Sequence, residues 1–212
     1  MIELDHITII APSLVEGVAH VQDCIGLDIP FGTRHRYMGT HNHRLQLGDR
    51  TYLEIVALDP EGADPGRARW FGLDNQAQIR ADWDAGRRLR GWVARTADLG
   101  RVLSAHPDTF GQEVSLPPER PEFGFSIPED GGLPMAGAAP SLIDHRGDPT
   151  SMADIPDLGA RLLSFTLEHP DPAPIASLFD AIGARNGPDI VLGPSLRYTA
   201  RIATPAGVRD LT

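Results

Sequence analysis

The pattern of apolar and polar positions repeats along the chain as a strand-like segment, an amphipathic helix and short extended segments. The first copy opens with LDHITIIA over residues 4–11, where apolar residues fall on both faces, as in a strand buried on both sides. Ser13 and Glu16 then form a capping-box pattern, and apolar residues follow at helical spacing until Gly26, a residue type that commonly ends helices. The pattern therefore predicts a strand followed by a helix.

The same order of segments recurs twice more. The second copy begins with GWVARTADLGRVLSAH at residue 91, and the third with LLSFTLEHPDPAPIASLFDAIG at residue 162. Extended segments follow each predicted helix, at residues 43–47, 51–57, 123–127, 141–144, 190–192 and 197–203. A recurring unit of strand, helix and antiparallel strands is a βαβββ module, and its repetition is informative about the fold.

We therefore predict an α+β fold in which repeated βαβββ modules form a cupped mixed β-sheet around a pocket, with a third partial module at the C-terminus. Module 1 covers about residues 1–58, the connection 59–89, module 2 about 90–147 and module 3 about 160–212. The connection is expected to hold a short helix around residues 75–84. Each module alone has too little apolar face to close a core, so we expect one domain over residues 1–212.

Composition and charge narrow the class of protein. The formal net charge of −10 argues against nucleic acids and anionic membranes as partners. No apolar run approaches the roughly 20 residues that span a bilayer, and MIELDHITII lacks the basic and apolar parts of a signal peptide. Cys24 is the only cysteine, so no internal disulfide can form. We expect a cytoplasmic protein.

Several segments carry a family resemblance. The opening L-D-H, the GTHN segment at residues 39–42 and the hairpin LGDRTYLEI at 47–55 resemble the glyoxalase-like domain proteins of the vicinal oxygen chelate superfamily. This superfamily includes glyoxalase I, extradiol dioxygenases, methylmalonyl-CoA epimerase and bleomycin-resistance proteins, and the likeness covers nearly the whole chain. It implies a small-molecule substrate or ligand and pairing of modules in a homodimer. In metal-using relatives, the first and last strands of two modules hold a divalent ion.

The resemblance also suggests where metal ligands would lie. His6 matches the first-strand histidine and Glu54 the last-strand glutamate, a pair that suits zinc, iron, manganese or nickel. In the second module the first-strand position falls on Trp92, or on Gly91 with a one-residue slip, and neither can bind a metal. The last strand offers Asp144. The predicted metal site is therefore His6, Glu54 and Asp144, with His41 as an alternative ligand and Glu54 as a catalytic base.

Polar residues near the first hairpin are candidates for substrate binding. A polar substrate group would form hydrogen bonds with Thr40, His41 and Asn42. At the pocket floor, Trp92 would pack on an apolar part of the substrate. The alternatives are a solvated polar hairpin and core packing of Trp92. Asp144 and the histidine after it precede the turn RGDP, which favours a strand end at the surface.

Two functions are consistent with these residues. The first is a small-molecule enzyme in which a divalent ion binds a vicinal-oxygen or carbonyl substrate while a carboxylate moves a proton, as in lyase, isomerase or dioxygenase chemistry. The second is a metal-free protein that binds and sequesters a small molecule, as bleomycin-resistance proteins do. Fold analogy does not choose between them.

Overall fold

The computed structural model describes residues 2–148 and 151–212. The first module runs through β1 (Ile2–Ile10), α1 (Leu14–Ile25), β2 (Phe31–His35), β3 (Thr40–Gly48) and β4 (Thr51–Leu58). The connection holds the 3₁₀ helix η1 (Trp70–Gly72) and α2 (Gln76–Asp84). The second module consists of β5 (Leu89–Arg95), α3 (Leu99–Ala105), α4 (Pro107–Phe110), β6 (Gln112–Leu116), β7 (Phe123–Ile127), η2 (Pro134–Gly137) and β8 (Ser141–Asp144). The C-terminal part consists of β9 (Arg161–His169), α5 (Ala173–Ile182), β10 (Ala184–Arg185), β11 (Asp189–Leu192), β12 (Arg197–Thr204) and β13 (Gly207–Leu211).

The helices begin and end where their capping residues lie. The backbone N–H of Glu16 donates to the Ser13 hydroxyl, which in turn donates to the Glu16 carboxylate at 2.8 Å. Gly26 and Gly183 end α1 and α5 with φ of 71° and 67°, a left-handed conformation that glycine adopts without a steric penalty. Within residues 2–148 and 151–212, no helix is long and apolar enough to cross a membrane.

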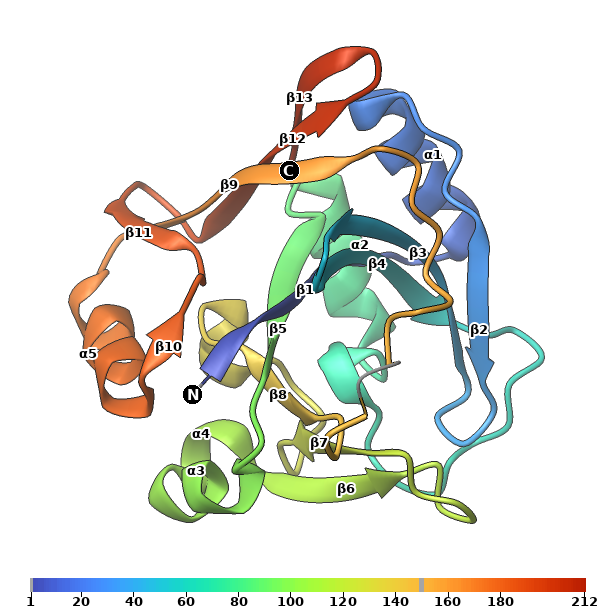
Figure 1. Cartoon of the computed structure of the whole chain (residues 1–212). Coiled ribbons are helices and arrows are strands. Elements are labelled where there is room, and N and C mark those ends of the chain that lie inside the picture. The colour runs from blue at the N-terminus through green and yellow to red at the C-terminus, as the bar shows by residue number, and fades with distance from the viewer. Residues whose placement is uncertain (1, 149–150) are drawn as a thin grey trace.

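Two sheets organise the molecule (Figure 1). The central mixed sheet has the order β2-β3-β4-β1-β5-β8-β7-β6, so the first strands of the two modules are antiparallel neighbours at its middle, and β10 adds a short parallel pairing to β1. The C-terminal strands form a separate sheet in the order β11-β9-β12-β13. The predicted α+β fold with a cupped mixed sheet and a third partial module is therefore confirmed, as is the helix in the connection.

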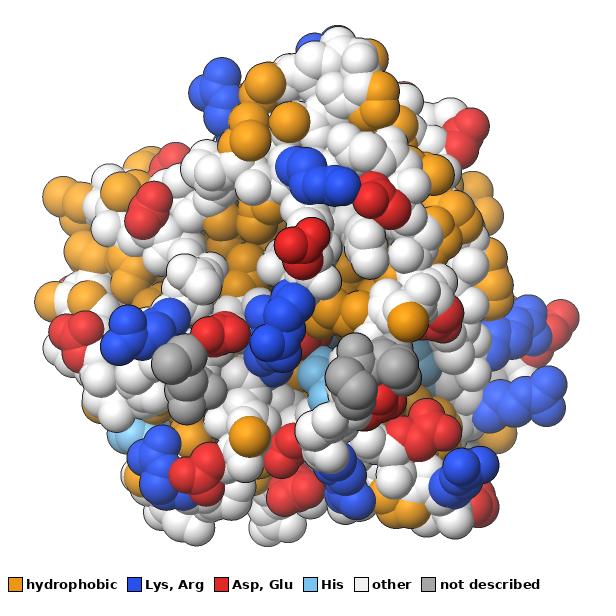
Figure 2. Space-filling model, viewed as in Figure 1, with side chains coloured by type: hydrophobic (Ala, Val, Ile, Leu, Met, Phe, Trp, Pro, Cys, Tyr) orange, Lys and Arg blue, Asp and Glu red, His pale blue; other side chains and the backbone are white. Residues whose placement is uncertain are grey.

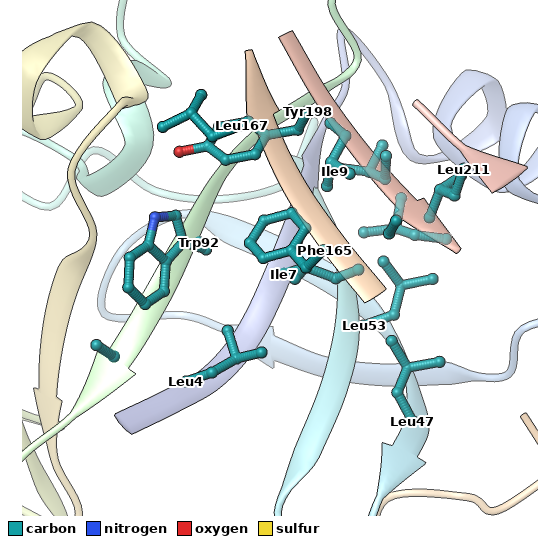
Figure 3. Packing of buried hydrophobic residues seen from close by; sticks show 14 of the residues in the cluster. Leu4, Ile7, Ile9, Leu47, Leu53, Trp92, Phe165, Leu167, Tyr198 and Leu211 are labelled. Carbon is teal, nitrogen blue, oxygen red and sulfur yellow. The ribbon is translucent and has the colours of Figure 1, made fainter. Parts of the chain in front are cut away.

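Each face of the central sheet has its own apolar cluster. On one face, Ile7 and Leu53 pack with α1 and with Phe165, Leu167 and Tyr198 of the C-terminal sheet (Figure 3). The other face carries a smaller cluster that includes Val56, Val93 and Phe125. The C-terminal part thus covers one face of the sheet, and the opposite face is left to form the site.

Candidate functional site

A cavity of about 340 Å³ opens on the face of the central sheet that α1 does not cover. His6 of β1 and Glu54 of β4 line it together with Asn42 of β3. β1 pairs in parallel with β4 and β3 pairs antiparallel with β4, and this register turns all three side chains to one face. Figure 2 shows histidine side chains in a hollow near the centre of this view, with carboxylates gathered below it.

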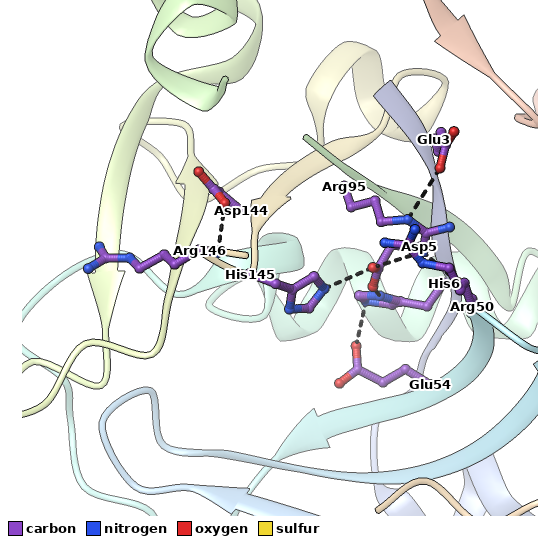
Figure 4. Close-up of polar contacts among 9 residues, drawn as sticks. All are labelled: Glu3, Asp5, His6, Arg50, Glu54, Arg95, Asp144, His145 and Arg146. Atoms are coloured by element: carbon purple, nitrogen blue, oxygen red, sulfur yellow. Dashed lines mark hydrogen bonds and ion pairs between the residues drawn. The ribbon is translucent and has the colours of Figure 1, made fainter. Parts of the chain in front are cut away.

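A buried chain of polar contacts runs through the site (Figure 4). His6 Nε2 lies 3.4 Å from Glu54 Oε2, and His6 Nδ1 lies 2.7 Å from Asp5 Oδ1. Asp5 Oδ2 is 2.9 Å from His145 Nε2 and 3.4 Å from Arg95 Nη1. Because Asp5 contacts side chains from both modules, it joins the two halves of the site.

Asp5 reaches His6 through an irregularity in β1. Neighbouring side chains of a regular strand point to opposite faces. The pairing of β1 with β5 shifts register between Leu4 and His6, which places a bulge at Asp5. The bulge allows the adjacent side chains of Asp5 and His6 to bond each other, and such bulges often occur beside functional sites.

Burial and charge shift the ionisation of these groups. Burial lowers the pKa of His6, but its interactions with Asp5 and Glu54 outweigh burial and raise this pKa to about 9. Burial raises the pKa of Asp5, yet hydrogen bonds from His145 and His6 hold it well below its usual range. The pKa of Glu54 is likewise raised by burial but lowered more strongly by His6. At neutral pH the site therefore contains an imidazolium between two carboxylates.

Asn42 and Tyr52 fix the positions of Glu54 and His6. The Asn42 amide donates to Glu54 Oε1 at 2.6 Å, and its own oxygen accepts from the backbone N–H of Thr33 at 2.8 Å. The Tyr52 ring stacks on His6 with 4.3 Å between centroids and 23° between planes. Both oxygens of Glu54 are thus oriented by neighbours before any ligand enters.

Aromatic rings form the apolar part of the cavity lining. We call the following residues the aromatic wall: Tyr37, Trp70, Phe71, Phe123 and Phe125. Trp70 and Phe125 meet edge to face at 5.4 Å between centroids, and Phe71 and Phe125 at 5.7 Å. The sequence pattern does not predict this wall, because Trp70 and Phe71 come from the irregular connection.

The family of this chain is shown by its sequence match to a family model. A family model described as a glyoxalase-like domain matches residues 4–183. The chain belongs to the glyoxalase-like domain family. The family predicted from the L-D-H opening and the repeated modules is therefore confirmed for this glyoxalase-like domain. No curated protein matches the chain.

Solved structures resemble this glyoxalase-like domain at low sequence identity. A hypothetical protein from Staphylococcus aureus aligns at 10% identity with a TM-score of 0.62, covering 100% of this chain and 99% of that one. Methylmalonyl-CoA epimerase from Mycobacterium tuberculosis aligns at 16% identity with a TM-score of 0.41, covering 71% and 91%. A methylmalonyl-CoA epimerase in complex with methylmalonyl-CoA aligns at 15% identity with a TM-score of 0.39, covering 68% and 94%. At these identities the S. aureus structure supports the fold alone.

The structure corrects the predicted place of Trp92. Its indole is 1% exposed and packs edge to face on Phe179 at 5.5 Å, within the core between the central sheet and the C-terminal part (Figure 3). Trp92 pairs with Ile7 and shares its face, which is opposite to that of His6. Core packing, the alternative weighed from the sequence, describes Trp92, and it does not line the cavity.

Other predicted residues are placed unevenly. Thr40 is buried beside the cavity and contacts His35 Nδ1 at 3.1 Å, whereas His41 lies on the other face of β3, 3.9 Å from Asp59. Asp144 faces a neighbouring cavity and accepts from the backbone N–H of Arg146 at 2.7 Å. Of the expected substrate-binding set, only Asn42 lines the cavity with His6 and Glu54.

The residues present do not fit the implied metal. A catalytic metal site takes three protein ligands and an open position. His6 and Glu54 supply two donors, and neither Asp144 nor His41 joins them. The other histidines of the lining are engaged elsewhere, His145 with Asp5 and His35 with Thr40. Among the residues that the structure describes, no group of three or more His, Cys, Asp or Glu is placed to hold a metal ion.

Proposed function

We propose that this glyoxalase-like domain is an enzyme that moves a proton at a carbon next to the carbonyl of a small molecule. The observation that carries the proposal is the buried pair of His6 and Glu54, 3.4 Å apart at the polar end of the cavity. At this separation the carboxylate can take a proton from a C–H bond while the charged N–H group donates a hydrogen bond to the adjacent carbonyl oxygen. The family's metal-assisted form of this chemistry needs a third protein ligand, and none of the described residues joins His6 and Glu54 as one.

In this proposal Glu54 is the base and His6 the electrostatic stabiliser. Glu54 takes the proton from carbon, and the electron pair moves onto the carbonyl oxygen. The His6 N–H donates to that oxygen as its negative charge develops, and Asp5 on the other nitrogen keeps the imidazole charged and oriented. A substrate oxygen that draws His6 away from Glu54 raises the pKa of the carboxylate and makes it a stronger base.

The test is exchange of carbon-bound protons with solvent deuterium, followed by NMR on small α-hydroxy ketones such as hydroxyacetone and 2-hydroxyacetophenone. We expect Glu54→Gln to slow the exchange at least about 100-fold, the range for loss of a general base. Glu119→Gln, on an exposed loop, is the matched control and should exchange at the wild-type rate. Equal rates for Glu54→Gln and wild type would refute the role of Glu54.

A metal-free binding protein is the second candidate. It is favoured by the contacts of Glu54, whose two oxygens already face His6 and Asn42. Metal analysis of protein purified without chelator, with His6→Ala as comparison, separates this candidate from a metalloenzyme. The protein is a binder if three results are found together: wild type contains no metal, wild type exchanges no carbon-bound protons, and the Glu54→Gln variant still binds the ketones normally.

A further inference from the structure

The cavity has a polar end and an apolar side, and this division bears on what it accepts. His6, Asn42 and Glu54 form the polar end, and the aromatic wall provides most of the apolar lining. Flat apolar groups pack on such ring surfaces, and edge-to-face contacts between rings add to the area buried. A ligand that fits both regions carries a planar apolar group beside its reacting oxygen.

The Trp70–Phe71 part of the aromatic wall is held in place by hydrogen bonds of the Arg69 side chain and of the Gly72 backbone. Arg69 Nε donates to the Met38 carbonyl at 2.9 Å, and Arg69 Nη1 donates to Asp74 Oδ1 at 2.6 Å. The N–H of Gly72 donates to the carbonyl of Gly131 at 2.7 Å. Phe71 between them has a φ of 61°, which is strained for a bulky side chain and persists where the surroundings impose it. This part of the wall is therefore fixed by the protein itself before a ligand enters.

Charges around the cavity disfavour an anionic ligand. Each cationic side chain that lines the described part of the cavity already has a carboxylate partner: His6 lies between Asp5 and Glu54, and Arg44 Nη2 donates to Asp154 at 3.0 Å. Glu122 adds another exposed carboxylate to the lining. The formal net charge of −10 acts in the same direction.

From these observations we infer that the cavity takes a small neutral aromatic ketone, with its ring on the aromatic wall and its carbonyl toward His6 and Glu54. The inference rests on the proposed function for the place of the carbonyl. The preference for a ring and the preference against negative charge rest on the wall and on the paired cations alone.

Binding without turnover tests the inference. The probes are 2-hydroxyacetophenone, its aliphatic counterpart hydroxyacetone and the aromatic anion benzoylformate, each titrated calorimetrically into wild-type protein. We expect 2-hydroxyacetophenone to bind about tenfold or more tightly than either of the other two, as burial of a phenyl ring provides. Equal affinities for the two ketones would overturn the role of the wall, and tighter binding of benzoylformate would overturn the charge argument.

Variants of the wall locate the effect. Phe123 and Tyr37 are only half-buried, so Phe123→Leu and Tyr37→Leu remove a ring at small risk to folding. Each should weaken 2-hydroxyacetophenone about fivefold to tenfold while leaving hydroxyacetone unchanged. Phe31→Leu, a 52% exposed ring outside the cavity, is the matched control and should bind like wild type. Loss of affinity for both ketones alike would place the effect outside ring recognition and count against the inference.

The two proposals fail separately. Selective binding of the aromatic ketone without proton exchange would sustain the ligand class and refute the chemistry. Proton exchange on both ketones without selective binding would do the reverse.

Discussion

At the scale of single residues, Asp5 is the side chain on which the other charged groups of the site converge. It is fully buried and lies within 3.4 Å of basic groups of His6, His145 and Arg95. A buried carboxylate with several such partners is stabilised by them. Its removal takes away one counter-charge from each partner, although His6 keeps Glu54 and Arg95 keeps Glu3.

Asp5→Asn should therefore lower the free energy of unfolding by about 3 kcal/mol, the range seen when one partner of a buried ion pair is removed. Urea unfolding at neutral pH measures the loss. Asp210→Asn on exposed β13 makes the same chemical change and should stay within about 0.5 kcal/mol of wild type. Similar values for the two variants would mean that the network contributes little to stability.

The same residues show what sequence could predict. His6, Asn42 and Glu54 follow from strand alternation, because regular pairing of β1, β3 and β4 sends them to one face. Asp5 could not be predicted, since alternation would send it away from His6 and only the bulge brings the two together. His145 follows a strand end and precedes a turn, a pattern that favours the surface, yet it contacts Asp5.

At the scale of elements, most strands were predictable, including β11 at one edge of the C-terminal sheet, but the edge strands β2, β6 and β13 were not. The segments at 51–57, 123–127 and 141–144 appear as strands with nearly the expected bounds, and the segment at 43–47 lies within the longer β3. β2 and β6 lie at the two edges of the central sheet. β2 has no buried residue and β6 exposes three of its five, so their hydrophobic pattern is weak. β13 is an edge strand of the C-terminal sheet with four exposed residues, and its hydrophobic pattern is weak for the same reason.

The turn that carries η1 depends on the absence of a side chain at Gly131. Its φ is 71°, and a Cβ there would collide with the carbonyl oxygen of Arg69. Gly131→Ala should cost about 2 kcal/mol or more in the free energy of unfolding and displace the Trp70 indole, which intrinsic fluorescence would detect. Gly66→Ala has a similar φ of 67° and open space around it, so it should cost about 1 kcal/mol. An equal cost at both positions would show that the collision is relieved.

At the scale of the whole molecule, segments far apart in sequence determine which face of the central sheet is covered and which face lines the cavity. Trp92 is buried because the C-terminal strands cover its face of the sheet. The sequence of the second module does not indicate which segment packs on that face. The aromatic wall likewise depends on the connection, whose polar and irregular sequence carries no strand or helix period around Trp70. Long-range packing of this kind leaves no local pattern to read.

Two histidines of the cavity lining should make stability depend on pH in opposite directions. Burial lowers the pKa of His35 to about 4, so between pH 6.5 and 4 the unfolded chain binds a proton that the folded chain does not, and the free energy of unfolding falls as pH falls. The pKa of His6 is raised to about 9, so the folded chain keeps a proton that the unfolded chain loses, and stability falls as pH rises from 6.5 to 9.

Urea unfolding across this range should therefore show a maximum near pH 6.5, with each limb falling by about 2–3 kcal/mol. His35→Gln should flatten the acid limb and His6→Gln the alkaline limb, whatever each variant does to overall stability. His106→Gln, a histidine remote from the cavity lining, is the control and should keep both limbs. Unchanged slopes in the first two variants would contradict the assignment.

The charged groups and the rings that share the cavity are encoded in separable stretches of chain. His6, Asn42 and Glu54 belong to three paired strands of the first module, whereas most of the rings come from the connection and from β7. Residues of the connection can therefore be exchanged without altering the His6–Glu54 pair. Replacement of residues 69–74 by those of another protein with this fold would change the rings Trp70 and Phe71 of the cavity and leave His6, Asn42 and Glu54 unchanged.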